Sequence, residues 1–471
     1  MVPDRLLLVG GHFVEGESFA EVRAPWDGRV LGHVAQASPA QAEQALAFAT
    51  SRRSVLASTS AGKRRQVLQH IVEGLERRRV DFIDTIVHEA GKPVSAARAE
   101  VARAIETFTL AAAELSRFGG ETVPVDLFPG AEGTTAEVRR VPAGVVMGLM
   151  PFNFPLNLGA HKVAPALAVG APIIIKPPPQ APSAMLLLGE LVLEAGADAG
   201  AVQVLPCSVD VAEPLATDAR VRVLSFTGSA KVGWHLKAKA RGKVLLELGG
   251  NAAAIVRPDA QVDAAAKKLA LGAFVNAGQV CIKVQRIVVE APVWERFVEA
   301  FLREVDRLGV GNPADEATVV GPLIDEANAR RVDAWVDEAV ARGATVLRRG
   351  TRAGAVVPPI VLTDVPRDAA VYAEEVFGPV VVLERVASFD DALVAVNASR
   401  YGLQAALFTN ELSAVRRAFA ELEVGGLVVN DAPSFRSDNM PYGGVKDSGL
   451  GREGVRYAMH DFTEERVLVL R

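Results

Sequence analysis

Apolar residues recur at the three- and four-residue spacing of amphipathic helices throughout residues 39–118. The pattern runs through AQAEQALAFA, KRRQVLQHIVEGLERRR, VDFIDTIVHEAG and SAARAEVARAIETFTLAAAELSRF. A Gly-Lys-Pro sequence at 91–93 interrupts it, and glycine and proline both end helices. This segment therefore predicts a series of helices with a break at 91–93.

The pattern changes to extended segments after residue 120. Residues 121–143 contain two extended runs around a Pro-Gly pair, which predicts a long hairpin. Between Val145 and Leu246, short apolar segments such as VVMGLM and PIIIK alternate with helical stretches. This alternation predicts a doubly wound parallel sheet that is covered by helices on both faces.

A second α/β unit is expected from about residue 248 to 447. The chain then ends on ERVLVLR, which is too apolar to remain an exposed edge strand. We expect this strand to pair with another chain, or with the 121–143 hairpin of one.

Composition excludes several classes of protein. Half of the 471 residues are apolar and 23% are charged, so the chain is not disordered and is long enough for two or three packed units. The net charge of −5, without a basic stripe, gives no reason to expect nucleic acid as a partner. The longest apolar stretch, Val163–Ile175, contains two prolines and a glycine and is too short to cross a membrane. There are only two cysteines and no signal-peptide pattern, which predicts a cytoplasmic protein.

Cys281, at the end of FVNAGQVC, is the first candidate for chemistry. A thiol that attacks a carbonyl needs a donor for the oxyanion and a base that activates water for the second half-reaction. Asn153 follows the apolar run VVMGLM and offers an amide, and Glu247 ends the strand VLLEL and offers a carboxylate. Together the three predict acyl chemistry through a thioester. The alternative for Cys281 is an inert buried thiol, which is our interpretation of Cys207.

A nucleotide site is expected at the carboxyl ends of the parallel strands, where such sheets bind ligands. The fingerprint G-x-G-x-x-G is absent, but FTGSAKVG places Gly228 and Ser229 between a strand and a helix, whose first amides favour a pyrophosphate. Lys176 ends the strand IIIK and is placed to bind a ribose hydroxyl or a phosphate. The alternative for Gly228 and Ser229 is that they form only a turn and a helix N-cap. The alternative for Lys176 is a lysine whose amine reaches solvent at the end of its strand.

Six motifs occur in the order PFNFP, FTGS, LELGGN, GQVC, EEVFGPV and PYGGVKDSGLGREG. In order and spacing they resemble the aldehyde dehydrogenase superfamily, over essentially the whole chain. The resemblance implies NAD(P)-dependent oxidation of an aldehyde to a carboxylate, with Cys281 as nucleophile, Asn153 as oxyanion donor and Glu247 as the base for hydrolysis. No metal is expected. Two other functions stay open: a coenzyme A-acylating semialdehyde dehydrogenase, against which Glu247 argues, and a catalytically silent protein of the same fold, against which the retained thiol and amide argue.

The resemblance also implies domains and a subunit arrangement. It predicts a dinucleotide-binding domain (1–120 and 144–247), a catalytic α/β domain (248–447) and a small β oligomerisation arm (121–143 and 460–471). A homodimer or homotetramer follows from the arm.

The cofactor implied by the resemblance is NAD or NADP. Many NAD-selective members carry a glutamate three residues after the strand-end lysine, and here Pro179 stands in that position, which removes the repulsion of a 2′-phosphate. The cofactor-binding residues implied in this chain are Pro151, Phe152, Lys176, Gly228, Ser229, Gly233, Leu248, Glu375 and Phe377.

The substrate is expected to be a small aldehyde. KVGWHLK, VLPCS and MPYGGVKDSGLGREG resemble the branch with lactaldehyde, phosphonoacetaldehyde and non-phosphorylating glyceraldehyde-3-phosphate dehydrogenases, whose substrates are often hydroxylated or anionic. Arg436 and Phe435 lie in a segment that would line the substrate mouth in this branch. The alternatives are a surface salt bridge of Arg436 with Asp431 or Asp438, and a Phe435 that only anchors its loop.

Overall fold

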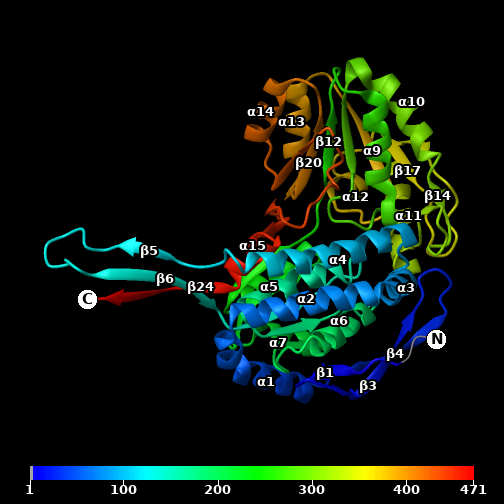
Figure 1. Ribbon diagram of the computed structural model, residues 1–471. Helices are drawn as coiled ribbons and strands as arrows, with labels where there is room; N and C mark the ends of the chain where they lie inside the picture. Colours follow the sequence, from blue (N-terminus) through cyan, green and yellow to red (C-terminus); the bar gives the residue numbers. More distant parts are fainter. Residues whose placement is uncertain (1–3) are drawn as a thin grey trace.

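The computed structural model describes residues 4–471 and contains two α/β units and a projecting β arm (Figure 1). The two units are stacked one above the other, and the arm extends away from them on one side. This is the fold class predicted from the sequence, and the similarity to solved structures reported below confirms it.

The first unit is built on an eight-stranded sheet. Its strands, in spatial order, are β2 (His12–Val14), β1 (Leu7–Val9), β9 (Val202–Val204), β8 (Ile173–Lys176), β7 (Val145–Leu149), β10 (Val221–Thr227), β11 (Lys243–Glu247) and β23 (Gly449–Leu450). The five central strands are parallel, as predicted from the alternating segments between Val145 and Leu246. The antiparallel edges formed by β1, β2 and β23 were not predicted, because two or three residues are too few to show a periodicity.

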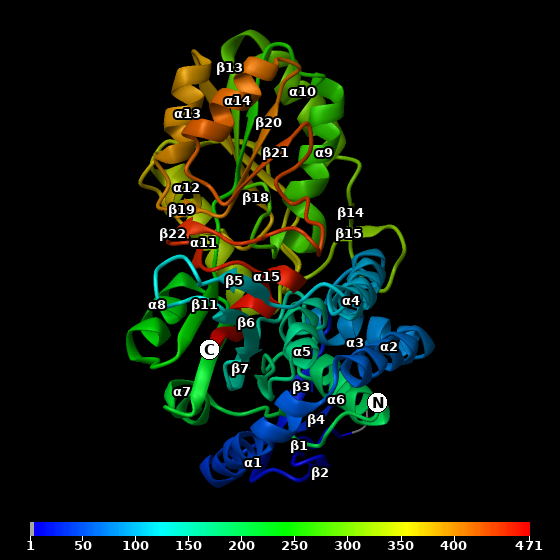
Figure 2. The same ribbon diagram turned by 60° about the vertical axis from the view of Figure 1, so that its left-hand side comes forward.

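Helices cover both faces of this sheet (Figure 2). One face carries α1 (Pro39–Ser58), α7 (Val209–Thr217) and α8 (Ala230–Lys239). The other carries α2 (Ala61–Arg77), α3 (Arg79–Ala90), α4 (Val94–Glu114), α5 (Asn157–Val169), α6 (Ser183–Glu194) and α15 (Val455–Asp461). Alternate residues of β8 pack into the hydrophobic cores on the two faces of the sheet. Ile173 and Ile175 lie in one core and Ile174 in the other. The helices expected in 39–118, and the break at 91–93, are confirmed.

The second unit has a seven-stranded sheet. Its strands, in spatial order, are β16 (Thr345–Arg348), β17 (Ile360–Thr363), β18 (Val380–Val386), β13 (Arg286–Glu290), β12 (Ala253–Val256), β20 (Gln404–Phe408) and β21 (Gly426–Val429). All neighbours are parallel except β16 and β17. One face packs against α9 (Val262–Phe274), α10 (Trp294–Val305) and α11 (Glu326–Ala341), and the other against α13 (Phe389–Asn397) and α14 (Leu412–Glu421).

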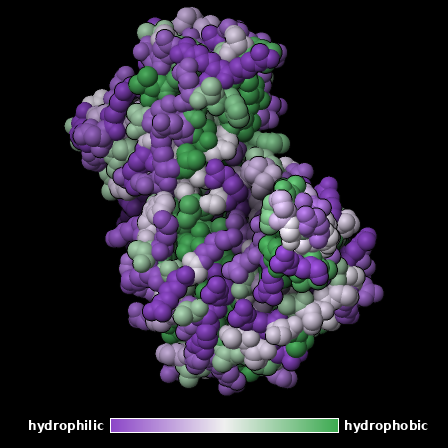
Figure 3. All heavy atoms as spheres, turned by 90° about the vertical axis from the view of Figure 1, so that its left-hand side faces the viewer, coloured by the Kyte–Doolittle hydropathy of each residue, from purple (hydrophilic) through white to green (hydrophobic). Residues whose placement is uncertain are grey.

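The arm is a three-stranded antiparallel sheet of β5 (Glu121–Pro124), β6 (Thr135–Pro142) and β24 (Thr463–Leu470). The predicted hairpin is confirmed as β5 and β6. The C-terminal strand was expected to pair with another chain, but it pairs with β6 of its own chain, from Thr463 opposite Pro142 to Leu470 opposite Thr135. The reason is that α15 returns the chain to the base of the arm. Figure 3, in which the arm points towards the viewer, shows hydrophobic atoms at its surface, and Val467–Leu470 are exposed.

Short elements complete the described chain. They are β3 (Ser18–Arg23) with β4 (Val30–Gln36), β14 (Gly309–Val310) with β15 (Thr318–Val320), β19 (Tyr401–Gly402) with β22 (Val445–Lys446), the helix α12 (Ala370–Ala373), and the 3-10 helices η1 (Val275–Gly278) and η2 (Ala291–Val293). Within residues 4–471, none of the helices has the length and apolar character needed to span a bilayer.

Candidate active site

The three residues proposed for chemistry line one crevice of about 430 Å³. Asn153 follows β7 and Glu247 ends β11, so both lie at the carboxyl edge of the first sheet. Cys281 reaches the crevice from the second unit, three residues after η1. The site therefore lies between the two units, where a substrate can be enclosed from both sides.

A rigid turn precedes Cys281. Asn276, Ala277 and Gly278 have consecutive left-handed backbone angles, with φ of 53°, 54° and 70°. Such angles are costly for residues with a Cβ and persist only where the surroundings enforce them. The Gln279 side chain supplies this restraint, because its amide donates to the carbonyls of Asn276 and Pro322 at 3.2 Å and its oxygen accepts from the Ile324 N–H at 2.9 Å.

Asn153 is held by a hydrogen bond to the segment just before Cys281. It is buried, and its Nδ2 donates to the backbone carbonyl of Gln279 at 3.0 Å. This bond uses one of the two amide hydrogens and leaves the other for an oxyanion. The following turn is fixed by Glu100, whose Oε1 accepts from the backbone N–H groups of Leu156 and Asn157 at 2.9 and 3.1 Å. Asn153 is thereby preorganised, which is what oxyanion stabilisation requires.

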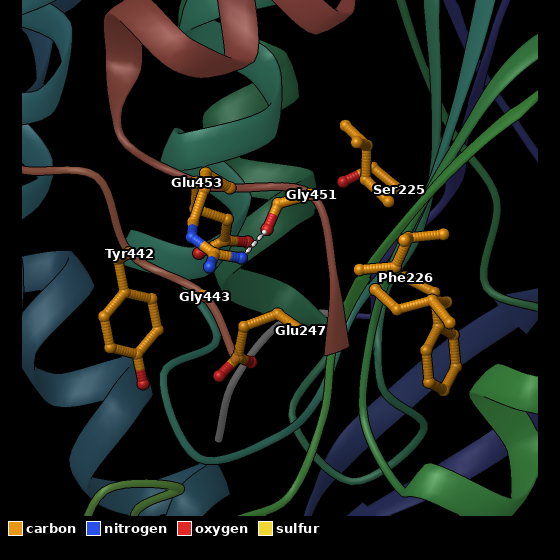
Figure 4. Close-up of a pocket in the computed structure, with 11 residues that line it drawn as sticks. Ser225, Phe226, Glu247, Tyr442, Gly443, Gly451 and Glu453 are labelled. Carbon is orange, nitrogen blue, oxygen red and sulfur yellow. Dashed lines mark hydrogen bonds between the residues drawn. The ribbon is translucent and has the colours of Figure 1, made fainter. Parts of the chain in front are cut away.

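Glu247 has the properties of a general base. Its side chain is buried, and Oε1 has no hydrogen-bond partner among the described residues. Burial, and then the charge of Glu453, raises the pKa of the Glu247 carboxyl to about 7. A base works best when its pKa lies near the working pH. Figure 4 shows the Glu247 carboxylate on the same side of a small cavity as the Tyr442 ring, with Ser225 and Phe226 on the opposite side.

Tyr442 touches Cys281, with its hydroxyl oxygen 3.0 Å from the Cys281 Sγ. Burial, and then the charge of Glu247, raises the pKa of the Cys281 thiol well above its usual value, whereas the Tyr442 hydrogen bond lowers it. Burial also keeps the phenol protonated by raising the pKa of Tyr442, so the hydroxyl can donate to the thiolate. Sequence reasoning assigned no role to Tyr442, because a tyrosine 161 residues away from the cysteine carries no local sign of this contact.

Replacing Tyr442 with phenylalanine is expected to raise the pKa of Cys281 further, because the thiolate loses its hydrogen-bond donor. The pH profile of Cys281 alkylation by iodoacetamide measures this, and it should move to higher pH by about one unit, the value of one charge-assisted hydrogen bond. An unchanged profile would show that the hydroxyl does not act on the thiolate.

Arg436 is buried behind Tyr442, and its environment differs from the surface salt bridge considered for it. Its guanidinium stacks on the Tyr442 ring at 3.9 Å and pairs with Glu453 at 3.1 Å. Neither Asp431 nor Asp438 is its partner: Asp431 pairs with Lys268 at 3.0 Å, and Asp438 pairs with Arg103 at 2.6 Å and with His161 at 2.8 Å. The pairing of Arg436 with Glu453 could not be predicted from the local sequence, since Glu453 comes from a later segment. Phe435 is 53% exposed and does not line the crevice.

Most of the predicted cofactor residues line the same crevice. These are Pro151, Phe152, Gly228, Ser229, Leu248, Glu375 and Phe377, and the structure adds Pro178, Pro179, Gln180 and Val232. Two predicted residues do not line it. Lys176 ends β8 in a mostly buried position, where burial lowers the pKa of its amine. At Gly233 a Cβ would overlap the Leu248 side chain, so this glycine lets α8 pack closely.

The Gly-Gly pair after Glu247 is explained by Glu375. The Glu375 Oε1 accepts from the backbone N–H of Gly250 at 3.1 Å, and a Cβ at Gly249 would overlap the Glu375 carboxylate. Burial raises the pKa of Glu375 to about 8. Phe377 beside it has a φ of 44° and packs edge-to-face against Phe152 at 5.8 Å. The strained backbone at Phe377 lies close to the strained turn before Cys281, because a Cβ at Gly278 would overlap the Gly378 carbonyl.

Comparison with known proteins decides the family. The model of the aldehyde dehydrogenase family matches residues 13–468. The chain belongs to the aldehyde dehydrogenase family. It is therefore an NAD(P)-dependent oxidoreductase that acts on aldehydes.

Relatives of this aldehyde dehydrogenase match the branch predicted from its motifs. It is 44% identical to 3-sulfolactaldehyde dehydrogenase of Priestia aryabhattai, over 90% of this chain and 89% of the relative, and 36% identical to lactaldehyde dehydrogenase of Methanocaldococcus jannaschii, over 98% and 100%. Among solved structures, aldehyde dehydrogenase 21 from Physcomitrella patens in complex with the reaction product succinate has a TM-score of 0.97 at 40% identity, covering 100% of this chain and 99% of that one. Glyceraldehyde-3-phosphate dehydrogenase GapN from Methanocaldococcus jannaschii, complexed with NADP, has a TM-score of 0.93 at 36% identity, covering 96% and 99%.

The crevice of this aldehyde dehydrogenase fits a dinucleotide. Ser229 is the N-cap of α8, and its side chain makes no capping hydrogen bond, so the first amides of the helix remain available to a pyrophosphate. Glu247 and Glu375 are the acidic residues among those that line the crevice, and Pro179, which bears no charge, also lines it. These features suit both NAD and NADP.

Proposed function

We propose that this enzyme oxidises a small aldehyde that carries an anionic group, through a thiohemiacetal and then a thioester on Cys281. The observation that carries the proposal is the convergence of Cys281, Asn153 and Glu247 in one crevice. In the first step, the Cys281 thiol releases its proton to water as the aldehyde binds, and the sulfur bonds to the aldehyde carbon. The C=O π electrons move to the oxygen, and the Asn153 amide and the Cys281 backbone N–H hold this oxyanion. When bound, NAD(P) would supply the hydride acceptor, and Gly228, Ser229 and Glu375 line the crevice that would hold it. Glu247 then takes a proton from the water that attacks the thioester, and the carboxylate product leaves.

Glu247 also supports hydrolysis over transfer to coenzyme A. A buried carboxyl with a pKa near 7 and an unpartnered oxygen suits water activation, whereas transfer of the acyl group to a thiol does not need this base. We therefore expect free carboxylate as the product, with no acyl-CoA when coenzyme A is added. The same groups support an active enzyme rather than a silent protein of this fold.

Replacing Asn153 with alanine is expected to lower kcat by about 10²–10³, the usual loss when one oxyanion donor is removed. KM should change less, because the hydrogen bond is made chiefly in the transition state. Steady-state kinetics measures both constants. A raised KM with unchanged kcat would remove Asn153 from the mechanism.

The preference for an anionic aldehyde rests chiefly on three relatives, and the groups behind Tyr442 form a cluster of paired charges. Lys162, Arg436 and Arg103 face two carboxylates, those of Glu453 and Asp438, at 2.6–3.2 Å. Burial lowers the pKa of His161, which keeps its ring neutral. Glu247 belongs to the same cluster, so the three cations face three carboxyl groups, and one positive charge is in excess only while Glu247 is protonated. Three of the relatives support the preference, since sulfolactaldehyde, glyceraldehyde 3-phosphate and the precursor of succinate all carry an anionic group, whereas the lactaldehyde of a fourth relative is uncharged.

A panel of small aldehydes tests the substrate class. We expect kcat/KM for anionic aldehydes to exceed that for uncharged ones of equal length by about tenfold or more, the effect of one partly buried ion pair. Replacement of Arg436 with glutamine should remove most of this advantage, and Phe435→Leu serves as the neighbouring control. Each assay is run with NAD and with NADP, and turnover is expected with both. If wild type and Arg436→Gln both oxidised neutral aldehydes as fast as anionic ones, the preference would be contradicted.

We further propose a homodimer or homotetramer in the cytoplasm. The arm supports the first point, because β24 is an edge strand whose outer edge has no partner in residues 4–471, with Val467–Leu470 exposed. Both cysteines are free, which suits a reducing compartment. Light scattering in solution measures the mass, and a monomer would contradict the assembly.

A further inference from the structure

A second cavity, of about 560 Å³, lies at the base of the arm. It is bounded by α1, α2, β6 and β24, and by the residues just before β7 and β8, Gly144 and Pro172. It therefore faces the amino ends of the central strands, whereas the catalytic crevice lies at their carboxyl ends. The two cavities share no lining residue.

Four arginines line this cavity, Arg53, Arg64, Arg140 and Arg466, and no carboxylate is among its lining residues. Arg140 pairs with Glu465. The other three form no salt bridge within residues 4–471. Arg53 and Arg466 are exposed and Arg64 is half-buried, and like charges gathered at one cavity repel one another unless an anion lies between them.

Two of these guanidinium groups are held in place by backbone carbonyls. Arg64 donates from Nη1 to the carbonyl of Val169 at 2.9 Å, and Arg53 donates from Nη2 to that of Ala143 at 3.4 Å. The Nε of Arg64 is buried and has no acceptor in the part of the chain that the structure describes. Because this Nε is closed off from solvent, an occupant of the cavity can meet only the outer N–H groups of the Arg64 guanidinium.

Glycines make room for both groups. Gly144 has a φ of 142°, and a Cβ there would lie 3.1 Å from the Cζ and Nε of Arg53. Gly170 has a φ of 78°, and a Cβ there would lie 2.7 Å from the Nη1 of Arg64. Any other residue would be strained in its backbone and would displace the guanidinium.

We propose that this cavity binds a small phosphorylated molecule, separately from catalysis. A guanidinium presents its N–H donors as a fork that matches a phosphate, and three such groups match an anion with more than one charge. The volume is that of an ordinary small-molecule site. The site is distinct from the cofactor crevice, so its occupant does not take part in the oxidation.

The test uses the full chain, with the cofactor crevice first saturated with NAD, and pyrophosphate as the probe. Calorimetric titration should find about one pyrophosphate per chain. The double variant Arg53→Gln and Arg466→Gln should lose at least about tenfold in affinity, the effect of losing charge-assisted hydrogen bonds. Arg65→Gln, an exposed arginine next to Arg64 on α2, is the matched control and should bind as wild type does. Because a bound ligand stabilises the folded state, pyrophosphate should also raise the Tm of wild type and of the control.

Three results would overturn the proposal. The first is that wild type binds no pyrophosphate at millimolar concentration. The second is that the double variant binds pyrophosphate as tightly as wild type does. Arg466→Gln alone is a second, milder variant for this comparison. The third is that citrate, which carries a similar charge but no phosphate, binds as tightly as pyrophosphate does. That result would contradict a site for phosphate. If the double variant changes the mass in solution while wild type binds no pyrophosphate, the arginines meet carboxylates of a second copy of the chain instead.

Discussion

Cys281→Ala is expected to abolish aldehyde oxidation and to leave NAD(P) binding nearly intact. The reason is that the proposed reaction begins with a bond to this sulfur, and the alanine variant has no other thiol among the residues that line the crevice. The residual rate should be below about one thousandth of the wild-type rate, the scale of loss when a covalent nucleophile is removed. Steady-state assays at 340 nm measure the rate, and fluorescence titration measures cofactor binding.

Cys207→Ala is the matched control for the loss of a thiol. Cys207 is buried in the core on the α1 face of the first sheet, where burial raises the pKa of its thiol to about 11. Cys207→Ala should therefore keep its activity, and only the stability of the fold should fall, because the core loses packing contacts. If Cys281→Ala kept a few per cent of the activity, or if Cys207→Ala were the inactive variant, the covalent assignment would be wrong.

Glu247→Gln is expected to slow turnover by about 10²–10⁴, the range for loss of a general base. The isosteric amide keeps the shape of the site but cannot take a proton from water, so the thioester should accumulate. Mixing enzyme, cofactor and aldehyde should give a burst of reduced cofactor close to one equivalent per site, followed by a slow steady state. If no burst occurred, Glu247 would act before hydride transfer, as the base for the thiol.

The pH dependence of the wild-type enzyme provides a control for this variant. Because the pKa of Glu247 is raised to about 7, the carboxyl is protonated and inactive below that pH, and the deacylation rate should fall as pH falls through about 7. Glu247→Gln should lose this dependence. Glu453→Gln should move it to lower pH, since the Glu453 charge raises the pKa of Glu247.

Sequence reasoning reached the fold and the centre of the site because both have local signatures. Alternating strands and helices between Val145 and Leu246 specify a parallel sheet, and the ends of its strands specify where Asn153, Gly228 and Glu247 meet. Cys281 comes from the second unit, and only the shared motifs linked it to that edge. The short antiparallel edge strands were missed because they contain too few residues for a periodicity.

The contacts around Cys281 depend on tertiary structure and could not be read from the sequence. Tyr442 reaches the sulfur, and Arg436 pairs with Glu453 instead of the nearby Asp431 or Asp438. The partners of Tyr442 and Arg436 depend on how the C-terminal segment folds over the first sheet, where β23 pairs with β11. The same reason applies to β24, whose partner in its own chain depends on the path through α15.

The most direct test of a thioester on Cys281 is mass spectrometry of Glu247→Gln, quenched in acid after mixing with cofactor and aldehyde. The account predicts an increase in mass equal to the acyl group, located by peptide mapping on Cys281 and absent when the cofactor is omitted. Turnover at the wild-type rate with no acyl group on Cys281 would contradict it.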